Sequence, residues 1–274
     1  MKHLKPPPLR AYLSIMKMRF AVQLQYRAAA AAGFFTQLFF GFVKISVLMA
    51  FFSSSTQPQP MSIAQTVTYL WLVQVTFRML PWIADREMMN MVRSGGIAYE
   101  LCRPLNLYVS WYSRMLAIRL VPTMLSGIPI FIIALMLPGR YAMSPPASPA
   151  AALAFIIALA GSLLLGCAMT NIITISSLWT GIGDGADLFF SASTMLLSGL
   201  TVPLPFFPEW SQPILRLLPF SSLADLPFRF YSGVTPASQL LPLMALQLAW
   251  ILAFVMAGLW LLRLATRRVV IQGG

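Results

Sequence analysis

Long runs of apolar residues constrain this chain more than any other feature of its sequence. At about 1.5 Å of rise per residue, a run of roughly 20 residues forms a helix long enough to cross the ~30 Å hydrocarbon core of a bilayer. Hydrophobic residues make up 58% of the chain and charged residues only 9%, too few to cover a soluble globular protein. We therefore predict an all-α integral membrane protein. The clearest candidate spans are Ala28–Phe52, Ile63–Ile83, Met115–Leu137 and Ala237–Leu262.

A further apolar region between Pro149 and Pro203 is too long for one span. It is interrupted once, by the sequence GIGDGAD at 181–187, which favours two crossings with a turn at the glycines. The second of these crossings, from about Leu188, is short. This gives six spans in total.

The segment before the first span has the pattern of a helix that lies in the membrane interface. Its apolar residues recur on one helical face, with basic residues elsewhere on the turn. The alternative is a plain basic flank. The residues of the apolar face are Leu9, Tyr12, Leu13, Met16 and Phe20.

The 19 basic residues outnumber the 7 acidic ones, and their distribution predicts the orientation. Basic residues gather on the cytosolic side of membrane proteins, so we interpret the net charge of +12 as topological and expect no nucleic-acid partner. Most lie in the N-terminal segment, in the loop 84–114 and at the C-terminus, which places both termini in the cytosol. The single transmembrane domain then divides into 1–27 (interfacial helix), 28–83 (spans one and two), 84–114 (cytosolic connector), 115–204 (spans three to five), 205–236 (outer segment) and 237–274 (span six and tail).

The third outer loop, Pro203–Gly233, is long, rich in proline and too apolar for a solvated loop. We expect short helices broken by prolines, either half-sunk in the outer leaflet or tucked back into the protein as re-entrant helices. An aromatic belt at the interface, with no further role, is the alternative.

Residue types that carry enzymatic chemistry are scarce. The chain has no phosphate-binding loop of the form G-x-x-x-x-G-K-[ST], and His3 is its only histidine, so we expect neither a cofactor nor a metal site. Cys102 and Cys167 have no pattern of a disulfide or metal pair. The sequence Gly181-Ile182-Gly183-Asp184 matches the G-x-G-D pattern of intramembrane aspartyl proteases, but no Tyr-Asp pair supplies the second carboxylate. A glycine turn whose aspartates cap the next helix is the alternative interpretation.

Polar side chains inside the predicted spans are candidates for a transport pathway or a subunit interface. Lys44 lies well within the first span, where a lone lysine costs about 2.5–3.5 kcal/mol to insert. It either lines a polar route or contacts a partner, or it snorkels outward along its stem. Gln37, Gln74 and Asn171, together with Gln247, could form hydrogen bonds between helices.

The connector between the second and third spans is longer and more charged than two antiparallel helices require. Gly95-Gly96 ends one helical element and Pro104 breaks the next. Met88, Met89, Met91 and Val92 form a short apolar patch beside charges, which suits docking to a soluble partner as well as it suits a solvated loop. Eight charged residues fall in the connector and the first turns of the third span: Asp85, Arg86, Glu87, Arg93, Glu100, Arg103, Arg114 and Arg119.

Three stretches resemble the ABC type-2 permeases, the membrane subunits of ATP-driven exporters. The connector sequence VRSGGIAYELCRPLN is similar to that family's R-S-G-x-(I/L)-x-x-x-L-x-R-P-L pattern. LSGLTVPLPFFPEW (197–210) is similar to its S-G-x-x-x-P-x-x-x-F-P signature, and RRVVIQGG to its basic ending with a glycine pair. The order and spacing of these motifs extend the resemblance over nearly the whole chain.

The resemblance implies a permease in a bacterial-type inner membrane. It implies a cytosolic ABC ATPase subunit that binds ATP and docks on the connector as on a coupling helix, and a second permease chain, identical or related. The contacts that it suggests to the ATPase are Glu87, Arg93, Glu100 and Arg103. The scarcity of polar residues in the spans mildly favours a hydrophobic or amphipathic substrate. Two other classes stay open: an intramembrane aspartyl-type enzyme built on Asp184, and a non-catalytic membrane scaffold.

Overall fold

The computed structural model describes residues 9–54, 59–81, 85–180 and 184–267. Within these ranges the chain is helical and contains no strand, which confirms the all-α prediction. The α-helices are α1 (Leu9–Gln25), α2 (Arg27–Ser54), α3 (Ile63–Thr76), α4 (Arg86–Arg93), α5 (Ile97–Leu101), α6 (Leu107–Met136), α7 (Pro149–Thr180), α8 (Asp184–Leu197), α9 (Gln212–Leu217), α10 (Asp225–Tyr231) and α11 (Leu240–Thr266).

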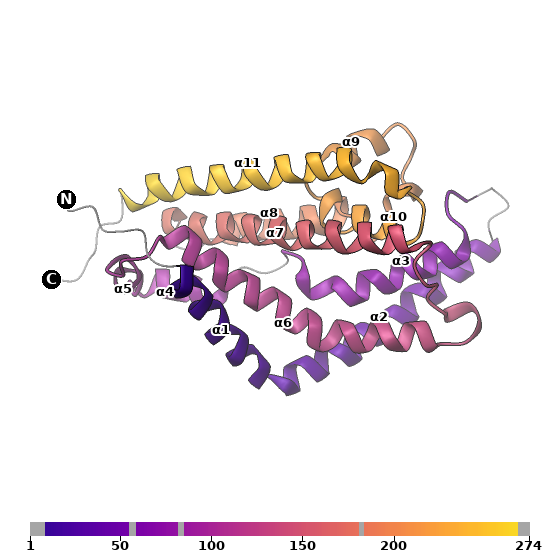
Figure 1. Ribbon diagram of the computed structural model, residues 1–274, viewed down its shortest axis with the longest axis horizontal. Coiled ribbons are helices and arrows are strands. Elements are labelled where there is room, and N and C mark those ends of the chain that lie inside the picture. Colours follow the sequence, from indigo (N-terminus) through magenta and orange to yellow (C-terminus); the bar gives the residue numbers. More distant parts are fainter. Residues whose placement is uncertain (1–8, 55–58, 82–84, 181–183, 268–274) are drawn as a thin grey trace.

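Helix α7 forms the centre of the bundle, and α6, α10 and α11 pack along it (Figure 1). In its most apolar window 56% of the residues are buried, compared with 17% for α2 and 11% for the helix that contains α11. Helices α2 and α11 are therefore peripheral and leave most of their apolar surface uncovered. Helices α4 and α5 lie at one end of the bundle, called here the connector end, and α9 and α10 lie towards the other, called the α9 end (Figure 1).

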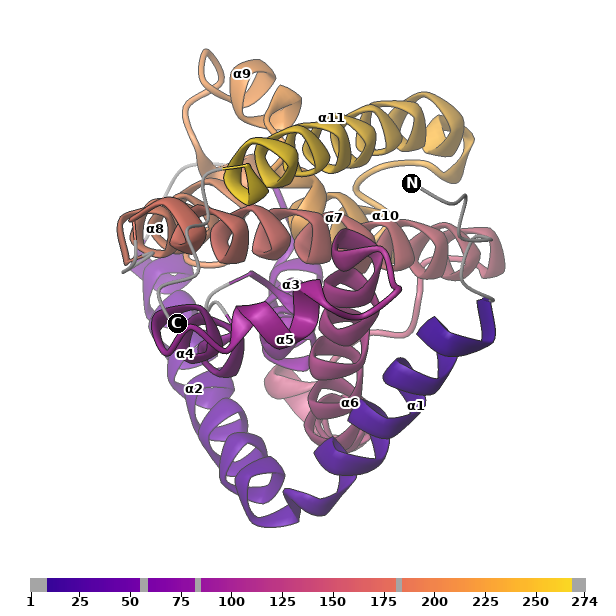
Figure 2. The same cartoon turned by 90° about the vertical axis from the view of Figure 1, so that its left-hand side faces the viewer.

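Helices α1 and α2 form a V, and α6 runs between its arms (Figure 2). Helix α1 packs on α6, and the backbone N–H of Asn106 donates to the Tyr12 hydroxyl at 2.9 Å. The Asn106 side chain in turn accepts from the N–H of Val109 and caps α6. The N-terminal helix is thus confirmed and is fixed to α6, whereas its position in a membrane interface stays a prediction.

Among the described residues, four helices are long and apolar enough to cross a membrane: α2, α6, α7 and the helix over Ala237–Thr266. The predicted second span is shorter than expected, because α3 ends at Thr76 and continues only as the 3-10 helix η1 (Phe77–Met79). The two predicted crossings between Pro149 and Pro203 are separate helices, α7 and the short α8. The six-span count therefore stays a prediction.

The connector contains the two helices that its punctuation predicts. Helix α4 ends at Arg93, Gly95 adopts a positive φ of 74°, and α5 ends three residues before Pro104. The predicted boundary with the third span is too late, however, because α6 begins at Leu107 rather than near Met115. Its first turns carry Arg114, whose charge made them look like part of a loop.

The segment that follows α8 divides into an exposed part and a buried part. Helix α9 exposes Ile214 and Leu217, and the neighbouring Trp210 is also exposed, whereas every residue of α10 is buried. The expected short helices are present, whereas the re-entrant arrangement and the interfacial belt both stay predictions. Gly199, at the start of this segment, has a φ of 87°, and a Cβ atom there would overlap the Tyr69 hydroxyl, so glycine is required at this turn.

Candidate functional site

A cluster of charged side chains joins three helices at the connector end. Asp85 caps α4 by accepting from the N–H groups of Glu87 and Met88 at 3.0 and 3.3 Å. Arg114 of α6 pairs with Asp85 through Nε and with Glu87 through Nη2 at 2.7 Å. Arg19 of α1 pairs with Glu87 through two 2.9 Å hydrogen bonds. The start of α4 is therefore tied to both α1 and α6.

The two arginines change the acidity of Glu87. Hydrogen bonds from Arg114 and then from Arg19 lower the pKa of the Glu87 carboxyl to about 2, against a smaller opposing effect of desolvation. Glu87 thus stays ionised at any physiological pH. Both oxygens of Glu87 already bind guanidinium groups, so its main role is to link α4 to α1 and α6. Its side chain nevertheless remains 56% exposed.

The apolar patch of α4 faces the bundle rather than the surface. Met88 is buried in a cluster with Tyr108 and Trp111 of α6, Ile175 of α7 and Leu262 of α11. The neighbouring methionine, Met89, packs against Ile173 and Phe190. Neither interpretation of this patch, docking to a soluble partner or a solvated loop, therefore describes its two most buried members, which instead anchor α4 on the bundle.

The exposed surface of the connector is provided by α5 and the turn after it. Tyr99 is 80% exposed, and Arg103, whose side chain is 57% exposed, pairs with Glu100 at 2.7 Å. The side chain of Arg93 lies outside the described residues. Of the four contacts suggested from sequence, Glu87 is engaged inside the protein, and Glu100 and Arg103 bind each other. Tyr99 was missed, although a large aromatic side chain between two glycines and a proline is a usable signal.

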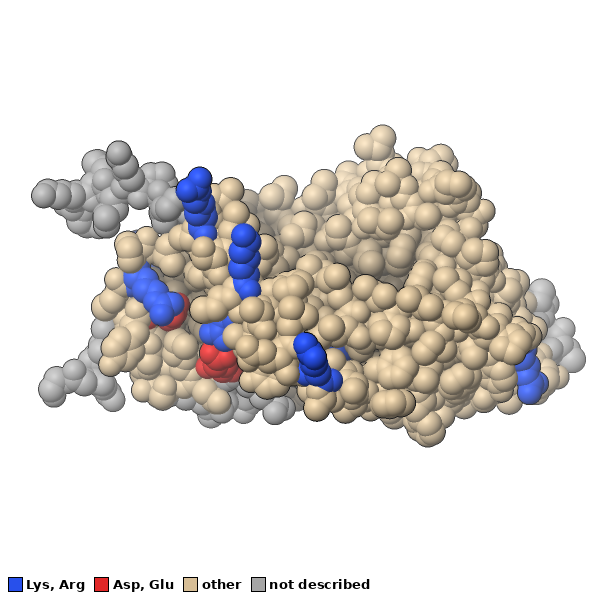
Figure 3. Space-filling model, turned by 60° about the horizontal axis from the view of Figure 1, so that its bottom comes forward, with Lys and Arg blue, Asp and Glu red and all other residues tan. Residues whose placement is uncertain are grey.

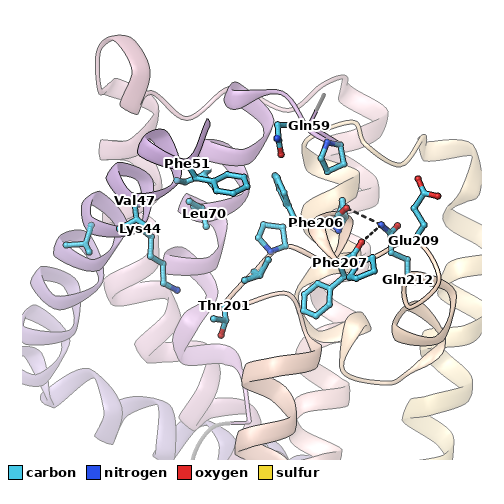
Figure 4. A pocket seen from close by; sticks show the side chains of 17 residues that line it. Lys44, Val47, Phe51, Gln59, Leu70, Thr201, Phe206, Phe207, Glu209 and Gln212 are labelled. Carbon is cyan, nitrogen blue, oxygen red and sulfur yellow. Dashed lines mark hydrogen bonds between the residues drawn. The ribbon is translucent and has the colours of Figure 1, made fainter. Parts of the chain in front are cut away.

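A second feature is a cavity of about 810 Å³ between α2, α3 and the segment 201–212 (Figure 4). Its walls are mostly apolar, with Val47 and Phe51 on one side and Phe206 and Phe207 on the other. Lys44 lies in the wall, and its Nζ donates to the Leu200 carbonyl at 3.2 Å. The lysine therefore points across the cavity towards Leu200, just after α8. Its role as a residue of the transport pathway stays a prediction. The cavity thus combines an apolar wall with one cation, Lys44, and one carboxylate, Glu209.

The other polar candidates do not join Lys44 in this cavity. Gln37 is buried and lines a different hollow near the connector end, and Asn171 of α7 donates to the Tyr108 carbonyl at 3.3 Å. Gln74 is buried in α3, and its Nε2 has no hydrogen-bond partner among the described residues. Gln247 of α11 donates to the Ala158 carbonyl of α7 at 3.1 Å. Asn171 and Gln247 thus link neighbouring helices, as their sequence positions suggest.

One buried charged pair escaped the sequence analysis. Arg229 Nε donates to Asp225 Oδ2 at 2.6 Å within α10, and Tyr69 of α3 donates to Asp225 Oδ1 at 3.2 Å. The i, i+4 spacing of the two charges was a signal for one helix, but the apolar loop around them left both a half-sunk and an internal position open. The G-x-G-D motif cannot be assessed in the same way, because residues 181–183 and the side chain of Asp184 lie outside the described residues.

These features define a polytopic helical membrane protein with a charged connector at one end and an amphipathic cavity towards the other. The profile of a family described as ABC-2 family transporter protein matches residues 35–273. The chain belongs to this family, whose membrane subunits are transport components that generally work with an ATPase subunit. Searches among curated proteins and among solved structures return no significant match.

Proposed function

We propose that the chain is the permease subunit of an ABC exporter in a bacterial-type inner membrane, with both termini cytosolic. It would form the transmembrane pathway, bind no cofactor itself and depend on a separate cytosolic subunit for ATP hydrolysis. Membership of the ABC-2 family supports the transport role. On the face shown in Figure 3, most of the charged side chains lie towards the connector end, as expected if that end is cytosolic.

The strongest support for the proposal is that the connector has one side packed on the bundle and another side exposed. Met88 on its inner side packs among α6, α7 and α11, while Tyr99 and the Arg103 side chain, which pairs with Glu100, are exposed on its outer side. The pairs of Glu87 with Arg19 and Arg114 add links to α1 and α6. A displacement of the connector by a moving ATPase would therefore reach most of the bundle as a near-rigid shift.

The second permease chain and the type of substrate rest on separate observations. Helices α2 and α11 leave broad apolar faces uncovered, which provides surface for an identical or related permease as well as for lipid. The cavity beside Lys44 is lined mainly by apolar side chains, with one cation from Lys44 and one carboxylate from Glu209, which suits a hydrophobic or amphipathic substrate.

Affinity purification from native membranes tests the proposal, with the co-purifying chains identified by mass spectrometry. A stoichiometric ATPase is expected, and Tyr99→Ala combined with Arg103→Glu should release it. The matched control at the α9 end is Trp210→Ala combined with Arg140→Glu, which changes an exposed aromatic residue and an exposed arginine and should retain it.

Absence of any ATPase under conditions that preserve a known exporter would refute the transport-subunit proposal. An ATPase that remains bound to the Tyr99/Arg103 variant would refute docking on the connector while leaving the transport role intact.

A further inference from the structure

Two adjoining hollows lie at the connector end, inside the V formed by α1 and α2 (Figure 2). Their volumes are about 380 and 610 Å³. They share a wall, and together they are bounded by α1, α2, η1 and α6. Five residues line both: Gln23, Arg78, Asp85, Ile118 and Pro122.

Arg78 presents a cation to these hollows. It is only partly exposed, and no hydrogen bond or ion pair joins it to another residue that the structure describes. Its guanidinium lies against Gly33 of α2, where an added Cβ atom would overlap it. A small residue on α2 thus makes room for a guanidinium that has no hydrogen-bond or ion-pair partner among the described residues.

Arg119 presents a second cation to the larger hollow. It is only 5% exposed, and its Nη atoms donate to the carbonyls of Met79 and Leu80 and to the Thr170 hydroxyl. Its Nε is buried and has no hydrogen-bond partner among the described residues. Backbone dipoles solvate this charge in part, but no described carboxylate binds it. A buried cation in this state favours an anion nearby.

The charges in the shared wall do not cancel. Arg19 and Arg114 are ion-paired with Glu87 and Asp85, whereas Arg78 and Arg119 form no ion pair with a described residue, and Asp187 and Asp85 act on Arg119 only through longer-range attraction. Apolar side chains complete the lining of the smaller hollow: Val22, Ala29, Ala30, Ile118 and Leu125. The combined site therefore has a cationic floor and an apolar wall.

We propose that this site binds the phosphate headgroup of an anionic membrane lipid. Arg78 would provide the exposed contact with the phosphate, Arg119 would add a buried positive field, and the apolar wall would cover part of the acyl chains. Its position is appropriate, because a connector end in the cytosol puts the site at the leaflet where anionic lipids attract basic groups. The site does not depend on how the ATPase docks.

Native mass spectrometry of the purified full-length protein tests the proposal with added phosphatidylglycerol, phosphatidylcholine or inorganic phosphate. We expect phosphatidylglycerol to bind preferentially. Arg78→Gln should lower the affinity for this lipid by roughly tenfold, because a charged hydrogen bond is lost. Gly33→Ala keeps every charge but displaces the Arg78 guanidinium, so it should also lower the affinity for phosphatidylglycerol.

Arg27→Gln is the matched control, because Arg27 is exposed at the same end and lines a different hollow. It should change lipid affinity by less than about twofold, since exposed charges contribute little. Equal binding of the two lipids, or equal losses in the Arg78 and Arg27 variants, would overturn the proposal. Displacement of the lipid by millimolar phosphate would show a site for free phosphate and would overturn the lipid assignment. Unchanged melting of each variant confirms that folding is intact.

Discussion

Asp225 and Arg229 show how single residues hold the segment after α8 in place. Both are buried, and each has a further partner, Tyr69 for the carboxylate and Thr235 for the guanidinium. The backbone N–H of Asp225 also donates to the Ser198 carbonyl at 3.1 Å. This one pair therefore connects α10, α3 and the end of α8.

Removing one partner should be far more costly than removing both. Asp225→Asn leaves the Arg229 charge buried without its counter-ion, and we expect a loss of roughly 3–5 kcal/mol of stability. Arg229→Met added to Asp225→Asn should restore much of that loss. Thermal melting of the purified protein, followed by tryptophan fluorescence, measures both effects. A single variant that melts like the wild type would contradict the structural role of the pair.

Glu87 predicts a pH dependence of its links to Arg19 and Arg114. Its pKa falls from the ordinary value of 4.5 to about 2 in the folded protein, so its contribution is complete above about pH 4.5 and is lost as the pH falls through about 2. The melting difference between the wild type and Glu87→Gln should therefore be constant from pH 8 to 5 and shrink below that range. A difference that stays unchanged as the pH falls from 5 towards 2 would show that the pKa is not lowered.

The partners of these charged residues could not be predicted from the sequence. Arg19 and Glu87 are 68 positions apart, and their contact depends on how α1 turns back along α6. Sequence patterns located the charged connector, but they could not distinguish a carboxylate that faces a partner from one already held by two arginines. The sequence also could not show that Asp225 and Arg229 are buried, because their burial depends on contacts with distant segments such as the one that contains Tyr69.

At the scale of elements, α4 is an amphipathic helix of eight residues whose apolar side meets the bundle. Its stability depends on that contact, because an isolated helix this short does not persist in water. The sequence revealed the amphipathic pattern and the flanking glycines, and hence the helix. It could not reveal which surface the apolar side covers, and it left docking to a partner and a solvated loop as equal alternatives.

A charge on the inner side of α4 should detach the connector from the bundle. Met88→Asp places a carboxylate among Tyr108, Trp111 and Leu262, with no described cation in that cluster to receive it. Hydrogen exchange across residues 86–101 should become at least tenfold faster, and proteases should cut there first. Asn90→Asp introduces the same charge at an exposed position of α4 and serves as the control. Equal exchange in the two variants would disprove the anchoring role of Met88.

Helix length is the other property that sequence predicts only in part. The long runs in α2, α6, α7 and α11 have the expected extents to within a few residues at most ends, because hydrocarbon thickness fixes how long an apolar helix must be. Helix α3 ends early, and most of its side chains are buried by neighbouring helices. A helix surrounded by protein needs no particular length, so an apolar run does not reveal where it stops.

At the scale of the whole molecule, the connector and the cavity beside Lys44 are different parts of one bundle. Helices α6 and α7 run from the clusters around Met88 to the core that packs beneath the cavity, so they can carry a displacement between the two. The transport proposal requires such coupling, although the two sites contact their ligands through different residues. Variants at each site should therefore separate substrate contact from ATPase contact.

Filling the cavity should block an amphiphile without disturbing the connector. Val47→Trp projects an indole into the space opposite Phe206, and Lys44→Gln removes its cation. With a diazirine-bearing palmitate as the probe, photolabelling of residues 43–51 and 201–212 should fall several-fold in both variants, while ATPase co-purification stays unchanged. Phe39→Trp alters an exposed α2 residue outside the cavity lining and should keep the labelling. Arg103→Glu should give the opposite pattern, with labelling retained and the ATPase weakened. If Val47→Trp and Phe39→Trp label alike, the probe meets α2 only from the lipid side and the cavity is not a substrate site.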